Sequence, residues 1–229
     1  MTSPESTIKL ASETFLALLS DAEREGLHGL GVRRSFPRGA VLMFQHEPDE
    51  RVMLLLAGRV KVVRLDQDGR ELLLSIRDPG DLLGELAFID GQPRIATVTA
   101  LEPVEALVTP APAFRLHLET TPRVAVVLLE VVTRRFRETT LKWSQFAALD
   151  TMGRLAARFV ELADRYGEPT EDGVSVASPL SQEELAAWTG ASRAGVAHAL
   201  QAMRELGWVQ TERRGLLVRD LEALRTRSV

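Results

Sequence analysis

Two adjacent hydroxyl side chains, Thr139 and Thr140, stand midway along an otherwise apolar helical seam. A buried hydroxyl group costs stability unless another group forms a hydrogen bond with it. We therefore expect a polar ligand to lie against this part of the chain. The alternative is that threonine only tolerates a crowded position between two helices.

A second group of residues forms the pattern of two short helices around a glycine turn. Ser181 and Glu184 make a capping box at the start of the first helix, and Ser192 caps the second helix directly after Thr189–Ala191. This arrangement is typical of a helix-turn-helix, whose second helix enters the DNA major groove. Arg193 then lies at the end of that helix where side chains reach base edges, and arginine pairs well with guanine.

A hairpin follows this pattern and makes the unit winged. Its strands are expected at Trp208–Gln210 and Leu216–Val218, with Arg213 and Arg214 in the turn between them. We expect the two arginines to contact DNA phosphates, which adds affinity without sequence preference. The alternative is an ordinary solvated turn.

Several chemistries are excluded or disfavoured by residue type. The chain has no cysteine, so disulfides, iron–sulfur ligation and thiol catalysis are excluded. The four histidines are isolated from one another, which favours ordinary surface roles over metal or haem ligation: His28, His46, His117 and His198. No nucleophile elbow or P-loop is present. We therefore expect no catalytic residue, no metal site and no enzyme activity.

The amino-acid composition is that of a globular protein with a net charge of −4. Its 229 residues are enough for one large or two ordinary domains. Any contact with DNA must come from a local basic patch because the whole chain is slightly acidic. No apolar run approaches the ~20 residues of a membrane span. The N-terminus lacks the pattern of a secretion signal, so we expect a cytoplasmic protein with no membrane partner.

The first half of the chain has the alternating pattern of short strands. Ser12 to Leu30 is predicted as a helix, and from Val32 to about Thr109 apolar residues alternate between recurrent turn signals. Many short strands at this spacing favour a sandwich or jelly roll. The alternating positions are Val41, Met43, Val60, Val62, Leu72, Leu74, Ile76, Ala96, Val98 and Ala100.

A long helix should separate the two halves. It begins near Thr121-Pro122, a cap residue followed by a proline at the first helical position, and ends near Leu149-Asp150. Spacings of three and four residues form an a/d seam, which predicts packing along another helix and a dimer. The seam residues are Leu129, Val132, Phe136, Thr139, Trp143 and Phe146.

Shorter elements flank this helix on both sides. A short helix is expected near Ala113–Leu118, before the long one, and another at Met152–Tyr166, after it. Residues 167–173 read as a polar loop, and Val174–Val176 as a short strand.

Three stretches together resemble the cyclic-AMP receptor protein family of bacterial transcription regulators. The first is Gly80–Ala87 with Pro93-Arg94, which looks like the family's phosphate-binding cassette. The second is Thr139-Thr140 followed by Leu149-Asp150, similar to its dimer helix and hinge. The third is Ser181–Arg193, similar to its DNA-reading unit. The resemblance covers nearly the whole chain because the three stretches occur in the family's order and separation.

The resemblance implies an α+β fold with three parts. Residues 1–120 would form a β-roll, or jelly roll, of the cyclic-nucleotide-binding kind that senses an effector. Residues 121–149 would form the dimerisation helix and hinge, and residues 150–229 the winged helix-turn-helix. The implied partners are double-stranded DNA, a second copy of the chain and RNA polymerase.

The same resemblance assigns an effector site. Backbone N–H groups after Gly84, at Glu85 and Leu86, would face an anion, and Arg94 would meet a cyclic phosphate with paired hydrogen bonds. Glu85 would accept from a ribose hydroxyl, and Thr139 and Thr140 would contact the base. Without the resemblance, Arg94 reads equally well as a solvated turn residue.

The chain departs from the family's pattern after the cassette arginine. Nucleotide-binding members usually have serine or threonine there, and this chain has Ile95. The lost hydroxyl would cost about 1–3 kcal/mol of phosphate binding. A cyclic nucleotide such as cAMP is the leading effector. A cyclic dinucleotide, an unrelated effector, or a constitutive regulator whose β-roll is only a dimer scaffold are the alternatives, and no fixed cofactor is expected.

The DNA-reading stretch also departs from the family. Ser192 would contact a phosphate and Arg193 a guanine, while Ala194 replaces the family's typical glutamate. His198 stands where the best-known member has a second base-reading arginine. We expect a two-fold symmetric site with half-sites ~34–36 Å apart. It would retain the guanine but be altered elsewhere.

Overall fold

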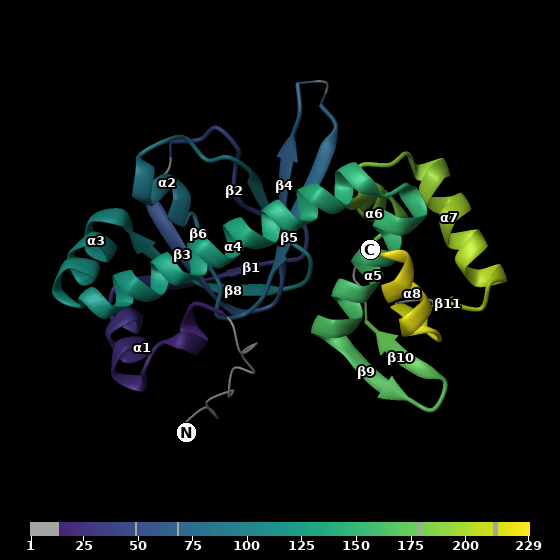
Figure 1. The fold of residues 1–229 in the computed structure, drawn as a ribbon. Helices are drawn as coiled ribbons and strands as arrows, with labels where there is room; N and C mark the ends of the chain where they lie inside the picture. Colours follow the sequence, from purple (N-terminus) through teal and green to yellow (C-terminus); the bar gives the residue numbers. More distant parts are fainter. Residues whose placement is uncertain (1–13, 49, 68, 178–179, 213–214) are drawn as a thin grey trace. The chain divides into compact units, whose positions relative to one another are not determined.

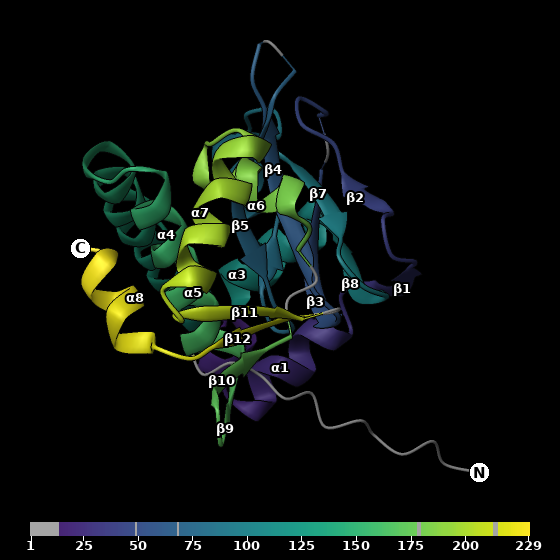
Figure 2. The same cartoon turned by 90° about the vertical axis from the view of Figure 1, so that its right-hand side faces the viewer.

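The structure is a computed structural model that describes residues 14–48, 50–67, 69–177, 180–212 and 215–229. These residues form two compact units, with the division between Phe136 and Arg137. Figures 1 and 2 show the elements of each unit. Helix α4 (Pro122–Ala148) contributes residues to both units.

The first unit is built mainly of strands. Its helices are η1 (Leu16–Leu18), α1 (Asp21–His28), α2 (Glu85–Asp90), α3 (Ala111–Thr120) and the first part of α4. Its strands are β1 (Val32–Phe36), β2 (Val41–Met43), β3 (Arg51–Ala57), β4 (Val60–Leu65), β5 (Glu71–Arg77), β6 (Leu82–Leu83), β7 (Thr97–Ala100) and β8 (Val104–Pro110).

The strands form two antiparallel four-stranded sheets, with orders β1-β8-β3-β6 and β2-β7-β4-β5. Strand β3 is buried on both faces, because successive side chains point in opposite directions. Met53 and Leu55 join the core that both sheets line, while Val52, Leu54 and Leu56 pack with the helices. This sheet-on-sheet arrangement confirms the predicted β-roll.

The helices cover the outer face of the β1-β8-β3-β6 sheet. Phe88 of α2 and Phe114 of α3 meet edge to face, with ring centroids 5.2 Å apart. Val124, Val127 and Val131 of α4 join the same core. Spacings of three and four residues place these valines on one side of α4, and that side is buried on the β-roll.

The predicted helix from Ser12 to Leu30 is two elements, so that prediction was wrong in the described part. The backbone is extended at Leu19 and Ser20, between η1 and α1. Ser20 caps α1 in a capping box with Glu23, which starts a new helix instead of continuing the old one.

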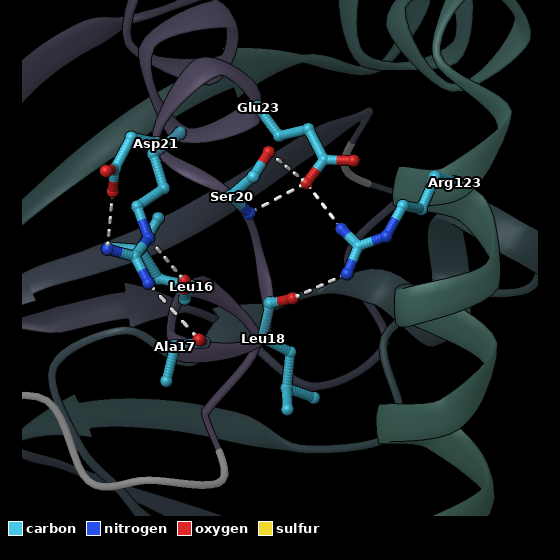
Figure 3. A network of polar contacts seen from close by, with 8 residues as sticks. Leu16, Ala17, Leu18, Ser20, Asp21, Glu23 and Arg123 are labelled. Atoms are coloured by element: carbon cyan, nitrogen blue, oxygen red, sulfur yellow. Dashed lines mark hydrogen bonds and ion pairs between the residues drawn. The ribbon is translucent and has the colours of Figure 1, made fainter.

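The capped end of α1 is bound to the start of α4 (Figure 3). Glu23 accepts hydrogen bonds from the Ser20 backbone N–H and hydroxyl, each at 2.7 Å, and from Arg123 at 2.5 Å. Arg123 also donates to the carbonyl of Leu18 at 3.3 Å. These contacts fix how the N-terminal helices sit on α4.

The predicted alternation of Leu72 and Leu74 is wrong in register. Leu73 and Ile76 are the buried residues of β5, and Leu72 is exposed. The pairing of β4 with β5 shifts between Val62 and Val63, which is the position of a β-bulge. One extra residue moves the following side chains to the opposite face.

The second unit contains the C-terminal part of α4 and a helical domain with one sheet. Its other helices are α5 (Thr151–Tyr166), α6 (Gln182–Thr189), α7 (Arg193–Glu205) and α8 (Leu221–Arg227). The strands β9 (Gly167–Thr170), β10 (Gly173–Val176), β11 (Val209–Glu212) and β12 (Gly215–Val218) form a sheet of order β11-β12-β10-β9. Figure 2 shows α7 above the β11 and β12 hairpin.

The prediction of a polar loop at residues 167–173 was wrong for its first part. Its first part is β9, which pairs antiparallel with β10 across a short turn. Polarity suggested a loop because β9 lies at the sheet edge, where side chains are exposed. The winged hairpin and the boundaries of α4 and α5 agree with the prediction.

The predicted seam of α4 is largely exposed in the single chain. Leu129 and Phe136 are 65% and 71% exposed in the first unit, and Trp143 is 73% exposed in the second. Val132 differs, because it packs partly against the core of the β-roll. The side chain of Phe146 lies outside the description. Large exposed apolar side chains at these positions are typical of a surface that binds a partner.

Candidate functional site

The cassette begins where β6 ends and α2 begins. Gly84 has φ +81°, a left-handed conformation that favours glycine. A Cβ atom at this position would lie 2.2 Å from Nη1 of Arg94. Gly84 is therefore required both by its own backbone and by the close approach of the arginine.

Arg94 lies directly against this turn. Its side chain is almost fully enclosed, since the residue is only 3% exposed. Nη1 donates to the carbonyl of Gly84 at 2.7 Å, and Nη2 donates to the carbonyl of Arg51. The structure thus brings Gly84 and Arg94 together as predicted, and it excludes the alternative of a solvated turn arginine.

Glu85, the first residue of α2, is buried and paired. Its Oε1 accepts a hydrogen bond of 2.6 Å from Nη1 of Arg135, while Nη2 of the same arginine donates to Asp81 at 2.7 Å. Arg135 also donates to the carbonyl of Leu82 at 3.0 Å. Burial works against the charge of Arg135, but the two carboxylates outweigh it and raise its pKa.

Sequence reasoning missed Arg135 and Asp81. Asp81 is part of the quoted cassette, but nothing local indicates that its partner lies 54 residues away on α4. A helix-surface pattern offers one signal, because Arg135 lies four residues after Val131, on the side of α4 that packs on the β-roll.

The remaining predicted effector residues are more open. Leu86 is exposed at the surface of α2, and Ile95 is 48% exposed beside the buried Arg94. Thr139 and Thr140 are exposed on α4 in the second unit.

The helix-turn-helix has the predicted caps. The Ser181 hydroxyl accepts from the N–H of Glu184 at 3.2 Å, and the Glu184 carboxylate accepts from the N–H of Ser181 at 2.8 Å. Gly190 follows α6 with φ +61°, a left-handed C-cap. The Ser192 hydroxyl then accepts from the N–H of Gly195 at 3.0 Å, which starts α7.

The predicted reading face of α7 is free of the protein core. Arg193, Ala194 and His198 are exposed, while the opposite side buries Val196, Ala199, Leu200 and Met203. The Ser192 hydroxyl proton is not used by its cap, so this group can still donate to a phosphate. Ser181 is exposed as well. The predicted contacts Arg213 and Arg214 lie outside the described residues.

The helical domain begins at Asp150, the N-cap residue of α5. Asp150 caps α5 by accepting from the N–H of Gly153 at 2.8 Å, and it also accepts from Arg227 of α8 at 2.5 Å. The cap hydrogen bond, together with Arg227, lowers the pKa of Asp150. Arg154 donates to the carbonyl of Thr189 at 3.1 Å and so binds the C-terminal end of α6 to α5.

The described part of the chain contains neither a candidate metal site nor a candidate membrane span. No group of three or more histidine, aspartate or glutamate side chains could hold a metal ion there. Among the same residues, no helix is both long and apolar enough to pass through a membrane.

A β-roll with a buried arginine at a glycine turn, joined to a winged helix-turn-helix, defines a class of two-part regulators. Residues 33–121 match the family described as cyclic nucleotide-binding domain, and residues 153–227 match the Crp-like helix-turn-helix domain. The chain belongs to the CRP family of bacterial transcription regulators, whose members are not enzymes.

Individual relatives agree with this family. The chain is 35% identical to the CRP-like cAMP-activated global transcriptional regulator of Mycobacterium tuberculosis, over 84% of this chain and 86% of the relative. It is 27% identical to a global nitrogen regulator of Synechocystis, over 84% and 87% of the two chains.

Solved structures share the fold. A mutant of CooA from Carboxydothermus hydrogenoformans has a TM-score of 0.80 at 23% identity, over 97% of this chain and 99% of that one. The c-di-GMP responsive regulator CLP of Xanthomonas campestris has a TM-score of 0.77 at 20% identity, over 87% and 99%.

Proposed function

We propose that this protein is a cytoplasmic, homodimeric regulator whose sequence-specific DNA binding is gated by a cyclic nucleotide. The observation that carries the effector proposal is the buried Arg94 beside Gly84. Its Nη1 donates at 2.7 Å to the Gly84 carbonyl, an acceptor that an anion can replace. A guanidinium fits a phosphate with two parallel hydrogen bonds. The relative from Mycobacterium tuberculosis is described as cAMP-activated, which makes cAMP the first ligand to test.

The remaining contacts of the proposal follow from the family assignment. N–H groups of Glu85 and Leu86 would face the phosphate, Glu85 would accept from the ribose, and Thr139 and Thr140 would contact the base. An effector at Glu85 has to share or replace the hydrogen bond from Arg135, which is 2.6 Å long. Ligand binding would therefore alter a contact that α4 makes, and a ligand shifts the protein only if it prefers one of its states.

DNA would be read by α7. Arg193 would contact guanine and Ser192 a phosphate, and Ala194 and His198 would alter the family's other contacts. Ser181 would approach the backbone, and Arg213 and Arg214 of the wing would add phosphate contacts whose strength falls with salt. RNA polymerase would be the further partner of the bound dimer.

Isothermal calorimetry tests the effector proposal. Wild-type protein is titrated with cAMP, cyclic GMP and cyclic di-GMP, and the Arg94→Ala variant with whichever binds. We expect loss of the charged phosphate contact to weaken binding by at least about tenfold. Ile95→Ser restores the family's hydroxyl and should strengthen binding of a mononucleotide. Equal affinity in wild type and Arg94→Ala would remove the cassette from the proposal.

A constitutive regulator is the second candidate, and the internal contacts of the site favour it. Arg94 already donates to two carbonyls, Glu85 is already paired with Arg135, and Ile95 supplies no hydroxyl. A guanidinium whose two Nη groups already donate within the protein gains less from a ligand. DNA binding of equal strength with and without each nucleotide would favour this candidate.

A further inference from the structure

A cluster of charged residues joins three helices of the second unit around Glu161 of α5. Its Oε1 accepts a hydrogen bond of 2.7 Å from Lys142 of α4, and its Oε2 accepts one of 2.6 Å from Arg158. Arg158 also donates to the side chain of Gln145, on α4, at 3.2 Å. Glu161 and Arg158 therefore bind the last turns of α4 to α5 at two points.

The cluster is enclosed by the helix-turn-helix. Trp188 of α6 is buried, and its ring centroid lies 5.6 Å from the guanidinium carbon of Arg158 and 6.0 Å from Nζ of Lys142. The side chains of Arg158, Glu161 and Lys142 are 8%, 18% and 28% exposed. A cation over the face of an indole ring is attracted to the ring, and more strongly where water is excluded. These cation–π contacts of Trp188 bind α6 to the same cluster.

The balance of charge makes Glu161 the central member. Lys142, Arg158 and Arg165 all lie within 4.0 Å of its carboxylate, the last at 3.5 Å. Burial opposes the charge of Glu161, but the cations outweigh it and lower its pKa. The pKa of Lys142 is lowered by burial and by the two arginines, because one carboxylate serves three cations. Without Glu161, the cluster would hold only like charges.

The contacts lie far enough from the joint between α4 and α5 to fix the angle between these helices. Only Leu149 and Asp150 separate α4 from α5. Lys142 lies eight residues before Asp150, and Glu161 eleven after it, so the contact forms roughly 12–16 Å along each helix from the joint. A short joint alone leaves the angle between two helices free, whereas a contact this far along both helices fixes it.

We infer that Glu161 is a positioning residue that fixes the orientation of the DNA-reading helices relative to the end of α4. The inference rests on the proposed dimer. If two α4 helices pair, the angle at Glu161 determines the separation of the two α7 helices. A fixed angle lets both bind one two-fold DNA site, and the second contact then gains from a high effective concentration.

The experiment compares two DNA duplexes. Wild-type protein first selects its site from random DNA, and fluorescence anisotropy then measures affinity for a duplex with both half-sites and for one with a single half-site. Lys142→Met keeps the length of the side chain and removes the ammonium. We expect it to lower full-site affinity by about tenfold and to leave half-site affinity within about twofold.

Arg165→Met is the matched control. Arg165 contacts the same carboxylate at 3.5 Å from within α5, and its removal leaves the hydrogen bond between Lys142 and Glu161 in place. The ratio of full-site to half-site affinity should therefore stay at the wild-type value. Glu161→Gln should lower the ratio, and adding Lys142→Met to it should have little further effect because the contact is already lost. Thermal unfolding of each variant establishes that it is folded.

The outcomes separate this inference from the proposed function. A wild-type protein that does not prefer the full site would contradict the proposed dimeric reading and this inference with it. A wild-type preference that Lys142→Met and Glu161→Gln leave unchanged would overturn the inference alone. An equal loss on both duplexes would also overturn it, because it would mean damage to the reading surface.

Discussion

Arg135 of α4 donates a hydrogen bond of 2.6 Å to the carboxylate of Glu85, fifty residues earlier in the chain. The same guanidinium donates to Asp81 at 2.7 Å, so one cation is shared by two buried carboxylates. This contact binds α4 directly to the glycine turn that holds Arg94. A change at the proposed effector site is therefore also a change at α4.

The Arg135→Ala variant should lose about 3–5 kcal/mol of unfolding free energy, because it leaves two buried carboxylates without their cation. Urea denaturation followed by circular dichroism measures this. Arg137→Ala is the control, since Arg137 is an exposed residue on the same helix, and it should change stability by less than about 0.5 kcal/mol. Equal stability of the two variants would show that the buried cluster contributes little.

The stability contributed by Glu23 should depend on pH. Hydrogen bonds from the side chain and backbone of Ser20 and from Arg123 lower its pKa from 4.5 to about 2. Because the folded pKa lies below the unfolded value, the contribution is complete above about pH 4.5 and is lost as the pH falls towards 2.

Thermal melts of wild type and Glu23→Gln across this range test the expectation. The difference in melting temperature between them should be largest at neutral pH and should shrink below about pH 4.5. A difference that stays constant down to the acid unfolding of the protein would mean that the charge of Glu23 is not what stabilises the junction shown in Figure 3.

Trp143→Glu should convert the proposed dimer to a monomer. Trp143 is 73% exposed in the single chain and lies on the predicted seam, so a dimer would bring two such glutamates near its symmetry axis. Sedimentation velocity reports the oligomeric state. Leu141→Glu is a matched control, because Leu141 is 67% exposed but lies about 140° around the helix from Phe136. Dissociation by both variants, or by neither, would argue against the seam.

Arg193→Ala should lose about 1–3 kcal/mol of specific binding and relax the DNA sequence at one position of each half-site. Selection from random DNA, with wild type and variant in parallel, reads out the preferred bases. His198→Ala should change a different position or none. An unchanged motif with Arg193→Ala would mean that the N-terminal end of α7 is not the reading surface.

Several features could be predicted because they depend on neighbours in the sequence. A serine followed three residues later by a glutamate marked the start of α6, and a threonine-proline pair marked the start of α4. Both rules concern backbone groups within one turn of a helix end. Family resemblance then predicted that Gly84 and Arg94 lie together, and they are in contact at 2.7 Å. Their role in binding an effector stays a prediction.

Other features were decided only by the tertiary structure. The bulge between Val62 and Val63 changed which leucine of β5 is buried, and β9 formed because β10 offered an edge to pair with. Arg135 with Glu85, and Lys142 with Glu161, are paired across 50 and 19 residues. The sequence by itself determined where α4, α6 and α7 start, which face of α4 forms the predicted seam and which family the motifs resemble. Which charges meet was decided by folding, because an arginine or lysine on a helix surface can reach any carboxylate that the fold brings within a few ångströms.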